Sequence, residues 1–325
     1  ELNKFKAENF WLRAGLTIVI LGWLSSLAVM NRNVTSVKTT TDSTAIYKLK
    51  KKKHITRTEL VAILGVTRAN IYKNINSLLS YKGKRKPVLI IEHLNKDHIA
   101  YLGTFLKNHN IDYRVYNYEL DKDFPTSIEP YSALAVMGGA MSANDPLLSN
   151  RQAEILILQA MLKDIPVIGH CLGGQLMSKA LGGTISKSPR PEIGWTPINY
   201  VNEYTKWFGS DPTDTVIQWH YDTFSVPTGA TLLASSDSCP NQAFSYGKHL
   251  AMQFHIEIDE EKVGVWVSED DDNWTESRQL YESVQDKSTI LENTHKYIEK
   301  HKHTADNIYT KWLETTEWYD LLKNR

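Results

Sequence analysis

The sequence predicts an α/β fold with a doubly wound, mostly parallel sheet, preceded by a small helical N-terminal segment. Two observations support this. From residue 87 onward, short apolar runs of strand length alternate with stretches of helical length, which is typical of a parallel sheet covered by helices. Two of these runs end in glycine-rich turns, at 138–139 and 169–174. In such folds the functional groups gather at the strand ends where these turns fall.

Composition agrees with a folded protein made of two unlike parts. The 325 residues include 42% hydrophobic residues and two cysteines, which excludes a disordered chain and a disulfide framework. At roughly 150 residues per domain, the length allows about two domains. The zero net charge hides an asymmetry, because residues 1–86 have 17 basic and 4 acidic side chains while residues 87–325 have 20 and 33. A basic segment is therefore joined to an acidic one.

Residues 14–30 form an apolar run of 17 residues without a charge. This length is at the lower limit of the ~17 to 25 residues that cross a bilayer. Three interpretations remain open: a membrane anchor, a buried hydrophobic helix, or an artefact of a chain that begins at Glu1 rather than Met. The Lys-rich stretch up to residue 54 is expected to be a solvated linker. Nothing downstream indicates secretion, so we expect a cytoplasmic protein, with membrane contact through 14–30 as the alternative.

Residues 55–86 resemble a helix-turn-helix. Apolar residues recur at helical spacing on each side of Gly65, which can end the first helix, and Thr67 can cap the second. The resemblance implies DNA binding, with the second helix in the major groove. Basic residues that can then contact phosphates follow it: Lys82, Lys84, Arg85 and Lys86. The alternative is an ordinary helical hairpin with a basic solvated face.

Residues 87–325 supply the elements of the sheet and its helices. The expected strands cover 88–91, 113–116, 133–137 and 166–168, and the expected helices cover 97–108, 151–163 and the stretch from the second glycine-rich turn through Leu181. Residues 184–256 contain shorter β-like runs, and residues 276–318 return to a helical pattern.

Cys171 is the first candidate for catalysis. It lies in VIGHCLGGQ, at a turn between an expected strand and an expected helix, with Gly169, Gly173 and Gly174 around it. Small neighbours permit such a tight turn, and the turn exposes the side chain above the sheet, as in a nucleophile elbow. A helix N-terminus also favours the thiolate, which is the attacking form.

His255 and Glu257 are candidates for the groups that assist this thiol. They lie in LAMQFHIEID, residues 250–259, which we expect to be a strand. Because side chains alternate along a strand, the two residues would share a face. His255 can then accept the proton of Cys171, and Glu257 can hold the imidazole in one tautomer and orientation.

These residues belong to motifs that resemble a known family. Residues 87 to about 315 resemble a class I glutamine amidotransferase domain of the kind that supplies ammonia to GMP synthetase, and this implies a flavodoxin-like sheet. Five separated motifs support the resemblance: VMGGAMSANDP at 136–146, GHCLGGQ at 169–175, EIGW at 192–195, WHYDTFSVP at 219–227 and MQFHIE at 252–257.

The resemblance implies that Cys171 forms a γ-glutamyl thioester and releases ammonia from glutamine. It assigns the oxyanion hole to backbone N–H groups of Gly138 or Gly139 and of Leu172. Ala140 stands where many relatives carry Pro, a change that removes no catalytic group. The implied substrate-binding residues are Gln175, His220 and Asp222.

No motif predicts a metal or a cofactor. The sequence has no Cys/His cluster with zinc spacing and no phosphate-binding GxxxxGK[ST] motif. Cys239 is expected to be a structural thiol, since no partner motif accompanies it.

Three functions remain open. The leading one is a glutaminase-type amidotransferase, whose ammonia we expect to reach a separate acceptor subunit because no acceptor domain is recognised in the chain. The second is a γ-glutamyl peptidase or hydrolase, which would use the same Cys, His and Glu with a different leaving amine. The third is a DNA-binding regulator in which the amidotransferase-like domain senses a ligand, although three intact catalytic residues argue against a purely sensory role.

Overall fold

The computed structural model describes residues 85–94, 98–121, 123–269 and 272–323. The predicted apolar segment 14–30, the linker that follows it and nearly all of the helix-turn-helix-like segment 55–86 lie outside these residues. Within the described part, no helix combines the length and the apolar character needed to cross a membrane.

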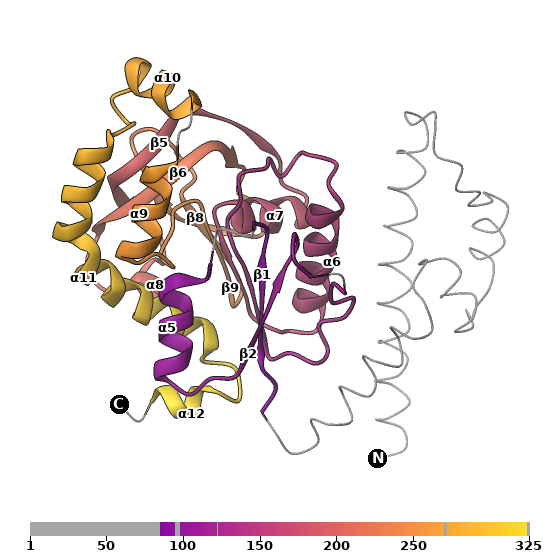
Figure 1. The fold of residues 1–325 in the computed structure, drawn as a ribbon. Coiled ribbons are helices and arrows are strands. Elements are labelled where there is room, and N and C mark those ends of the chain that lie inside the picture. The colour runs from indigo at the N-terminus through magenta and orange to yellow at the C-terminus, as the bar shows by residue number, and fades with distance from the viewer. Residues whose placement is uncertain (1–84, 95–97, 122, 270–271, 324–325) are drawn as a thin grey trace, which may run out of the picture. The chain divides into compact units, whose positions relative to one another are not determined.

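The described residues form one nine-stranded sheet (Figure 1). Its strands are β1 (Val88–Glu92), β2 (Tyr113–Asn117), β3 (Ala133–Val136), β4 (Val167–His170), β5 (Ile185–Tyr200), β6 (Thr213–Phe224), β7 (Thr231–Ser235), β8 (Ala243–Tyr246) and β9 (His249–Met252). They are arranged in the order β2-β1-β3-β4-β9-β8-β7-β5-β6. The α/β fold predicted from the sequence is therefore confirmed.

The sheet is mixed, with a parallel half and an antiparallel half, so it has fewer parallel pairs than the mostly parallel sheet expected from the sequence. From β2 to β9 every neighbouring pair is parallel, and from β9 to β6 every pair is antiparallel. The antiparallel half comes from the region in which the sequence showed only short β-like runs. Its long β5–β6 ribbon carries an irregularity between Lys187 and Glu192, around Pro189 and Pro191, which cannot donate ladder hydrogen bonds.

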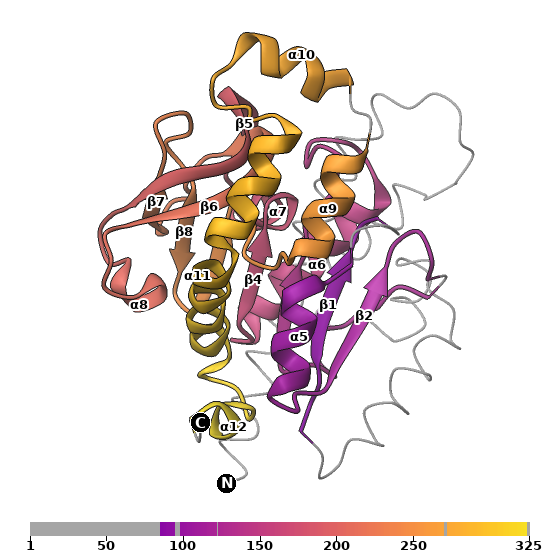
Figure 2. The same ribbon diagram turned by 60° about the vertical axis from the view of Figure 1, so that its left-hand side comes forward.

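Helices cover both faces of the parallel half (Figures 1 and 2). The helices of the described residues are α5 (Ala100–Asn108), α6 (Leu148–Leu162), α7 (Leu172–Ala180), α8 (Thr205–Phe208), α9 (Glu260–Ser268), α10 (Asp272–Leu280), α11 (Lys287–Leu313) and α12 (Tyr319–Leu322). Figure 2 shows α5, α9 and α11 in front of the sheet and α6 and α7 behind it.

The two faces bury separate apolar clusters because side chains alternate along a strand. Val88 and Ile90 of β1 pack with α5 and α11, whereas Leu89 and Ile91 pack with α6 and α7. All five residues of β1 are buried, as expected for a central parallel strand covered on both sides.

Several expected elements differ in extent from those observed, among them the helix expected from residue 97, which begins at Ala100. The strand expected over 250–259 ends at Met252. The helix expected from residue 151 begins at Leu148. The helical stretch 276–318 is divided into α10 and α11, because the Asp286 side chain accepts a 2.8 Å hydrogen bond from the Thr289 N–H and caps α11 there.

Candidate active site

Cys171 lies in the turn that joins β4 to α7. Its backbone has φ 48° and ψ −107°, and a positive φ is uncommon for a residue other than glycine. The turn is held by the Cys171 N–H, which donates to the Met252 carbonyl at 2.9 Å, and by the Gln175 N–H, which donates to the Cys171 carbonyl at 3.0 Å. The fold therefore imposes the strained conformation.

The glycines around Cys171 are required because backbone atoms approach them closely. A Cβ on Gly173 would lie 2.0 Å from the Val136 carbonyl oxygen, and one on Gly174 would lie 2.5 Å from that of Met252. These approaches seat the start of α7 directly against β3 and β9. The small neighbours singled out in the sequence thus serve packing as well as the turn.

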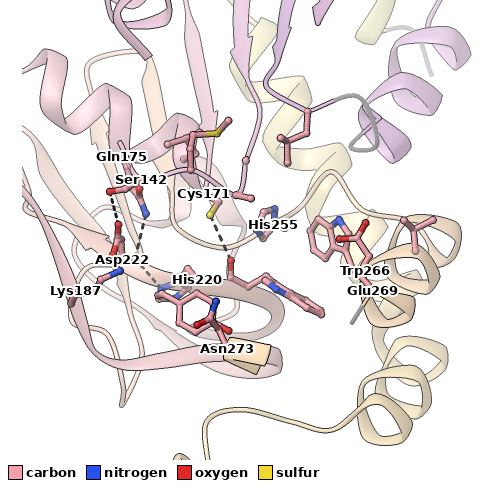
Figure 3. A pocket seen from close by; sticks show the side chains of 18 of the residues that line it. Ser142, Cys171, Gln175, Lys187, His220, Asp222, His255, Trp266, Glu269 and Asn273 are labelled. Atoms are coloured by element: carbon pink, nitrogen blue, oxygen red, sulfur yellow. Dashed lines mark hydrogen bonds and ion pairs between the residues drawn. The ribbon is translucent and has the colours of Figure 1, made fainter. Parts of the chain in front are cut away.

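A cavity of about 730 Å³ opens above the carboxyl ends of the parallel strands and includes Cys171 and His255 in its lining. In Figure 3, Gln175 and Asp222 lie on one side of Cys171, and His255 and Trp266 lie on the other. The cavity therefore has two ends, which we call the Gln175 end and the Trp266 end. Cys171 is only 6% exposed, so access to it is through this space.

His255 and Glu257 follow β9 in an irregular segment rather than on the expected strand. They nevertheless meet, with His255 Nδ1 2.7 Å from Glu257 Oε1, and both are buried. An isolated bridge between Ile217 and His255 fixes this segment to β6. The expectation that a strand would align the two side chains was wrong, because the backbone bends after Met252, but the pairing itself is present.

The buried charges of this pair stabilise one another. Burial alone lowers the pKa of His255, but the Glu257 carboxylate and the nearby Cys171 outweigh burial and raise it. Burial alone raises the pKa of Glu257, but the charge of His255 outweighs it and holds that pKa well below its usual range. The pair therefore favours an imidazolium beside a carboxylate.

Gly138 lies beside both Cys171 and His255. A Cβ there would be 3.1 Å from His255 Cε1 and 3.7 Å from Cys171 Cβ. Gly139 and Leu172 line the cavity. The structure thus brings all three residues that the resemblance implied for an oxyanion hole to the neighbourhood of Cys171.

The three residues expected to bind substrate also line the cavity. Gln175 Nε2 donates to the Asp222 carbonyl at 3.3 Å. The Asp222 carboxylate accepts from Ser142 Oγ at 2.8 Å and pairs with Lys187 Nζ at 2.8 Å. His220 is almost fully buried and turns its Nε2 toward Glu192 Oε2, 3.2 Å away. Gln175 and Asp222 thus form a polar end of the cavity, while His220 supports it from behind.

Glu192, His220 and Cys239 form a second cluster, whose potential ligand atoms all lie within 4.8 Å of one another. These groups already have protein partners. The Glu192 carboxylate also accepts from Gln242 at 2.6 Å and Ser236 at 2.8 Å, and the Cys239 thiol is 3.1 Å from the Thr223 hydroxyl. Burial raises the pKa of Cys239, which agrees with a structural thiol.

Three residues near Cys171 were not found from the sequence. Gln253 Nε2 donates to Cys171 Sγ at 3.5 Å, and its Oε1 accepts from Gln175 Nε2 at 3.3 Å. The Trp266 ring packs edge-on against His255 at 4.8 Å, and Lys262 lies 3.8 Å from Glu257. Gln253 lies inside the MQFHIE motif, which could have drawn attention to it, but no local pattern marks the other two.

The fold and this arrangement define an α/β protein with a cavity-lining cysteine in a tight strand-to-helix turn at the carboxyl ends of its parallel strands. A family model described as glutamine amidotransferase class-I matches residues 102–267, about half of the chain. The chain therefore belongs to the class I glutamine amidotransferase family.

Relatives agree with this assignment. The chain is 35% identical over 150 residues to the glutamine amidotransferase-like protein YfeJ of Salmonella typhimurium, covering 43% of this chain and 62% of YfeJ. It is 36% identical over 107 residues to one subunit of the glutamine-hydrolyzing GMP synthase of Sulfolobus acidocaldarius, covering 32% of this chain and 57% of the relative. The chain thus matches less than two thirds of the length of either protein.

Solved structures share the fold over a larger region. The crystal structure of a glutamine amidotransferase from Methylobacillus flagellatus superposes with a TM-score of 0.67 at 34% identity, covering 72% of this chain and 96% of that one. One from Thermotoga maritima gives a TM-score of 0.63 at 25% identity, covering 71% and 99%.

Proposed function

We propose that this protein hydrolyses the γ-amide of glutamine through a thioester on Cys171, as a cysteine-dependent amidotransferase or glutaminase. The observation that supports this most directly is a single cavity lined by both Cys171 and His255, with Glu257 behind the imidazole. An amide requires a strong nucleophile and a donor for its leaving nitrogen. Cys171 and His255 supply these two groups.

The proposed reaction has two halves. The Cys171 thiolate attacks the γ-carbonyl carbon, the C–N bond breaks, and His255 gives its Nε2 proton to the departing ammonia. Water then attacks the thioester while His255 takes a proton from it, and the C–S bond breaks to release glutamate and the thiolate. His255 Nδ1 is occupied by Glu257, and the imidazole also interacts with the Cys171 side chain, so Nε2 is the nitrogen available for this exchange.

Backbone donors supply the remaining contribution to catalysis. We assign the oxyanion hole to Gly138 or Gly139 together with Leu172, since Gly138 lies close to both Cys171 and His255. One such donor contributes about 10² to 10³ in rate.

The Gln175 end suits the amino-acid head of the substrate. Lys187 and Asp222 place a cation and an anion 2.8 Å apart in the cavity lining, which is complementary to the carboxylate and ammonium of a γ-glutamyl group. His220 keeps this end in shape through its 3.1 Å hydrogen bond to the Asp222 carbonyl. The leaving amine then faces the opposite end, where His255 can protonate it.

The Trp266 end favours a second candidate, a γ-glutamyl peptidase or hydrolase. Beyond His255 the cavity continues along Trp266 and Glu269 (Figure 3). Ammonia needs none of this space, whereas a larger amine would occupy it. For the first candidate, the relatives that are subunits of GMP synthase support a separate protein as the acceptor of the ammonia.

We also propose that the chain divides near residue 86, with the basic segment 55–86 as a helix-turn-helix-like appendage to the amidotransferase domain at 87–325. The charge asymmetry supports this boundary, with net charges of +13 and −13 on its two sides.

A substrate screen tests the proposal. Purified full-length chain is incubated with glutamine, γ-glutamyl dipeptides and γ-glutamyl anilides, and ammonia, amine and glutamate are quantified beside Cys171→Ala. Release of ammonia from glutamine alone supports the amidotransferase. Faster release of larger amines supports the hydrolase. Turnover that survives in Cys171→Ala would refute the thioester, and absence of turnover with every donor would favour a sensor.

A further inference from the structure

Lys262 is a buried lysine beside the Glu257 carboxylate. Only 1% of it is exposed, its Nζ lies 3.8 Å from Glu257 Oε1, and it donates to the His98 carbonyl at 2.9 Å. Burying an ammonium is costly unless it is paired. Lys262 also lies in the first turn of α9, where the helix dipole disfavours a cation. Burial and the helix dipole therefore both disfavour a charged lysine at this position, and its ammonium depends on the contacts that it makes there.

The other titratable groups that face Glu257 are neutral or change their charge during the reaction. Burial lowers the pKa of both His170, on β4, and His301, on α11, to about 4. Burial raises the pKa of Tyr309, also on α11, well above its usual value. His255 loses and regains its proton in the reaction proposed above. Among the described groups around Glu257, Lys262 is thus the cation that takes no part in the proposed proton exchange, and its charge lowers the pKa of Glu257.

This fixed charge has two effects on the His255–Glu257 pair. When His255 is neutral, the buried Glu257 carboxylate still has a cation beside it, so it stays ionised. When His255 is protonated, Lys262 offsets part of the attraction of Glu257 for that proton. A histidine that must both give and take a proton benefits from this balance, because a carboxylate alone would hold the proton too tightly.

Lys262 also contacts the wall of the cavity. Its Nζ lies 5.3 Å from the centre of the Trp266 ring, and that ring packs against His255. The lysine therefore touches both the carboxylate and the aromatic side chain that position the imidazole.

We propose that Lys262 is a positioning residue for the hydrolysis described above: its buried ammonium keeps Glu257 ionised and sets the pH range over which His255 exchanges protons. The inference rests on the proposed function and adds to it a third group behind the imidazole, beyond the Cys, His and Glu that the sequence identified.

The test compares Lys262→Met, Lys262→Gln and Lys262→Arg with wild type. Two pH profiles are recorded: kcat/KM with the best γ-glutamyl donor, and the rate at which iodoacetamide alkylates Cys171, followed by mass spectrometry of its peptide. Removing a positive charge favours the protonated form of every neighbour. Both neutral variants should therefore move both profiles to higher pH by about one unit, and Lys262→Arg should restore them toward wild type.

Lys302→Met is the matched control. Lys302 pairs with Glu260 of α9 at 3.2 Å and with Glu299 of its own helix at 2.8 Å. It is partly exposed, and these two surface carboxylates are its ion-pair partners in the part of the chain that the structure describes. Its variant should superimpose on wild type in both profiles, because an exposed pair is screened by solvent.

The outcomes separate the two proposals. Folded neutral variants with wild-type profiles would overturn the role of Lys262, and failure of both to fold would assign the lysine to stability alone and overturn it as well. Absence of hydrolysis in wild type refutes the proposed function instead. The alkylation profile needs no substrate, so it still reports on Lys262 in that case.

Discussion

Cys171, His255 and Glu257 form one group of three buried residues, and Cys239, His220 and Glu192 form another of the same composition. The imidazole–carboxylate distances are 2.7 Å in the first and 3.2 Å in the second. The difference lies in the surroundings of the thiols. Cys171 lines the cavity with a positive φ, whereas Cys239 is fully buried.

The two carboxylates also differ in how many side chains donate hydrogen bonds to them. Glu192 is held by hydrogen bonds from His220, Ser236 and Gln242, so the imidazole is one donor among several. Glu257 has His255 as its hydrogen-bonded side-chain partner and Lys262 at 3.8 Å. Three residue types in proximity therefore do not make a site. The first group differs from the second in three ways: Cys171 has a strained backbone, it lines the cavity, and Glu257 accepts a side-chain hydrogen bond from the imidazole without the additional Ser and Gln donors that Glu192 has.

The largest expected difference between the two groups is the difference in kcat between Cys171→Ala and Cys239→Ala. Cys171→Ala should reduce kcat by at least about 10⁴-fold, because loss of a nucleophile in a group that acts as a unit removes most of its catalysis. Cys239→Ala should keep kcat within about twofold and lower the free energy of unfolding by ~1 kcal/mol, through the small cavity and the lost contact with Thr223. Ammonia release and urea unfolding measure the two effects. Equal losses of activity would remove the distinction between the two groups.

Replacing Glu257 or Glu192 by glutamine should give a smaller difference in kcat between the two groups than replacing their cysteines. Glu257→Gln is expected to lower kcat about 10²- to 10⁴-fold, because the imidazole loses its anionic partner and its preferred tautomer. Glu192→Gln should lower the free energy of unfolding by about 1 to 3 kcal/mol and change kcat less than tenfold. Steady-state kinetics and circular dichroism in urea decide this. A larger kinetic loss for Glu192→Gln would make the second group functional.

The tight packing beneath Cys171 can be tested by adding a methyl group. Gly173→Ala should destabilise the fold by about 3 kcal/mol, because its Cβ would lie 2.0 Å from the Val136 carbonyl oxygen. Gly264→Ala is the matched control in α9, where an added Cβ meets no atom within 4 Å, and it should stabilise by ~0.5 to 1 kcal/mol. Thermal and urea unfolding give both values. Similar effects at the two sites would contradict the packing.

The last expected effect concerns acid stability near Cys171. His170 precedes it, and His301 donates to the His255 carbonyl at 2.9 Å. Burial lowers both pKa values to about 4, so between pH ~6.5 and ~4 the unfolded chain binds protons that the folded chain does not. Stability should therefore fall as pH falls through this range. Each histidine contributes up to about 1.4 kcal/mol per pH unit.

Replacing one of these histidines checks the sign of that effect. His170→Gln should flatten the dependence of the unfolding free energy on pH by about the contribution of one proton. Urea unfolding from pH 7 to 4 provides the measurement. An unchanged slope would mean that His170 is not buried in its neutral form.

The sequence predicted the central strands and the turn cysteine because their signals are local. Val88 to Ile91 are continuously apolar, and Cys171 stands among glycines. The extent of β9 was overestimated because Phe254, Ile256 and Ile258 alternate with polar residues as on a strand, yet they are buried by an irregular segment. An alternating apolar pattern indicates which residues are buried. Whether those residues form a strand or a buried irregular segment depends on backbone pairing, which the pattern does not show.

The sequence also predicted that Cys171, His255 and Glu257 lie close together, because the motifs that contain them resemble those of one family and occur in the same order. It did not predict Lys262 or the second Cys, His and Glu group. Lys262 looks like a solvated lysine in an acidic helix start, DEEK, because nothing local marks it as buried. Cys239 is 47 residues from Glu192, and their proximity depends on how the β5–β6 ribbon and β7 pair. Long-range pairing of this kind has no local signal.

The insertion of β9 between β4 and β8 has a consequence for the order of events during synthesis. β4 carries Cys171 at its end, while His255 follows β9, and the two strands pair Ile168 with Leu250 across some 80 residues of intervening chain. A growing chain must therefore close a long loop before the thiol meets its imidazole. Until β9 leaves the ribosome, the nascent Cys171 has neither the Met252 carbonyl that holds its turn nor the His255 imidazole beside it. The arrangement of Cys171 beside His255 can therefore form only after most of the domain has been synthesised.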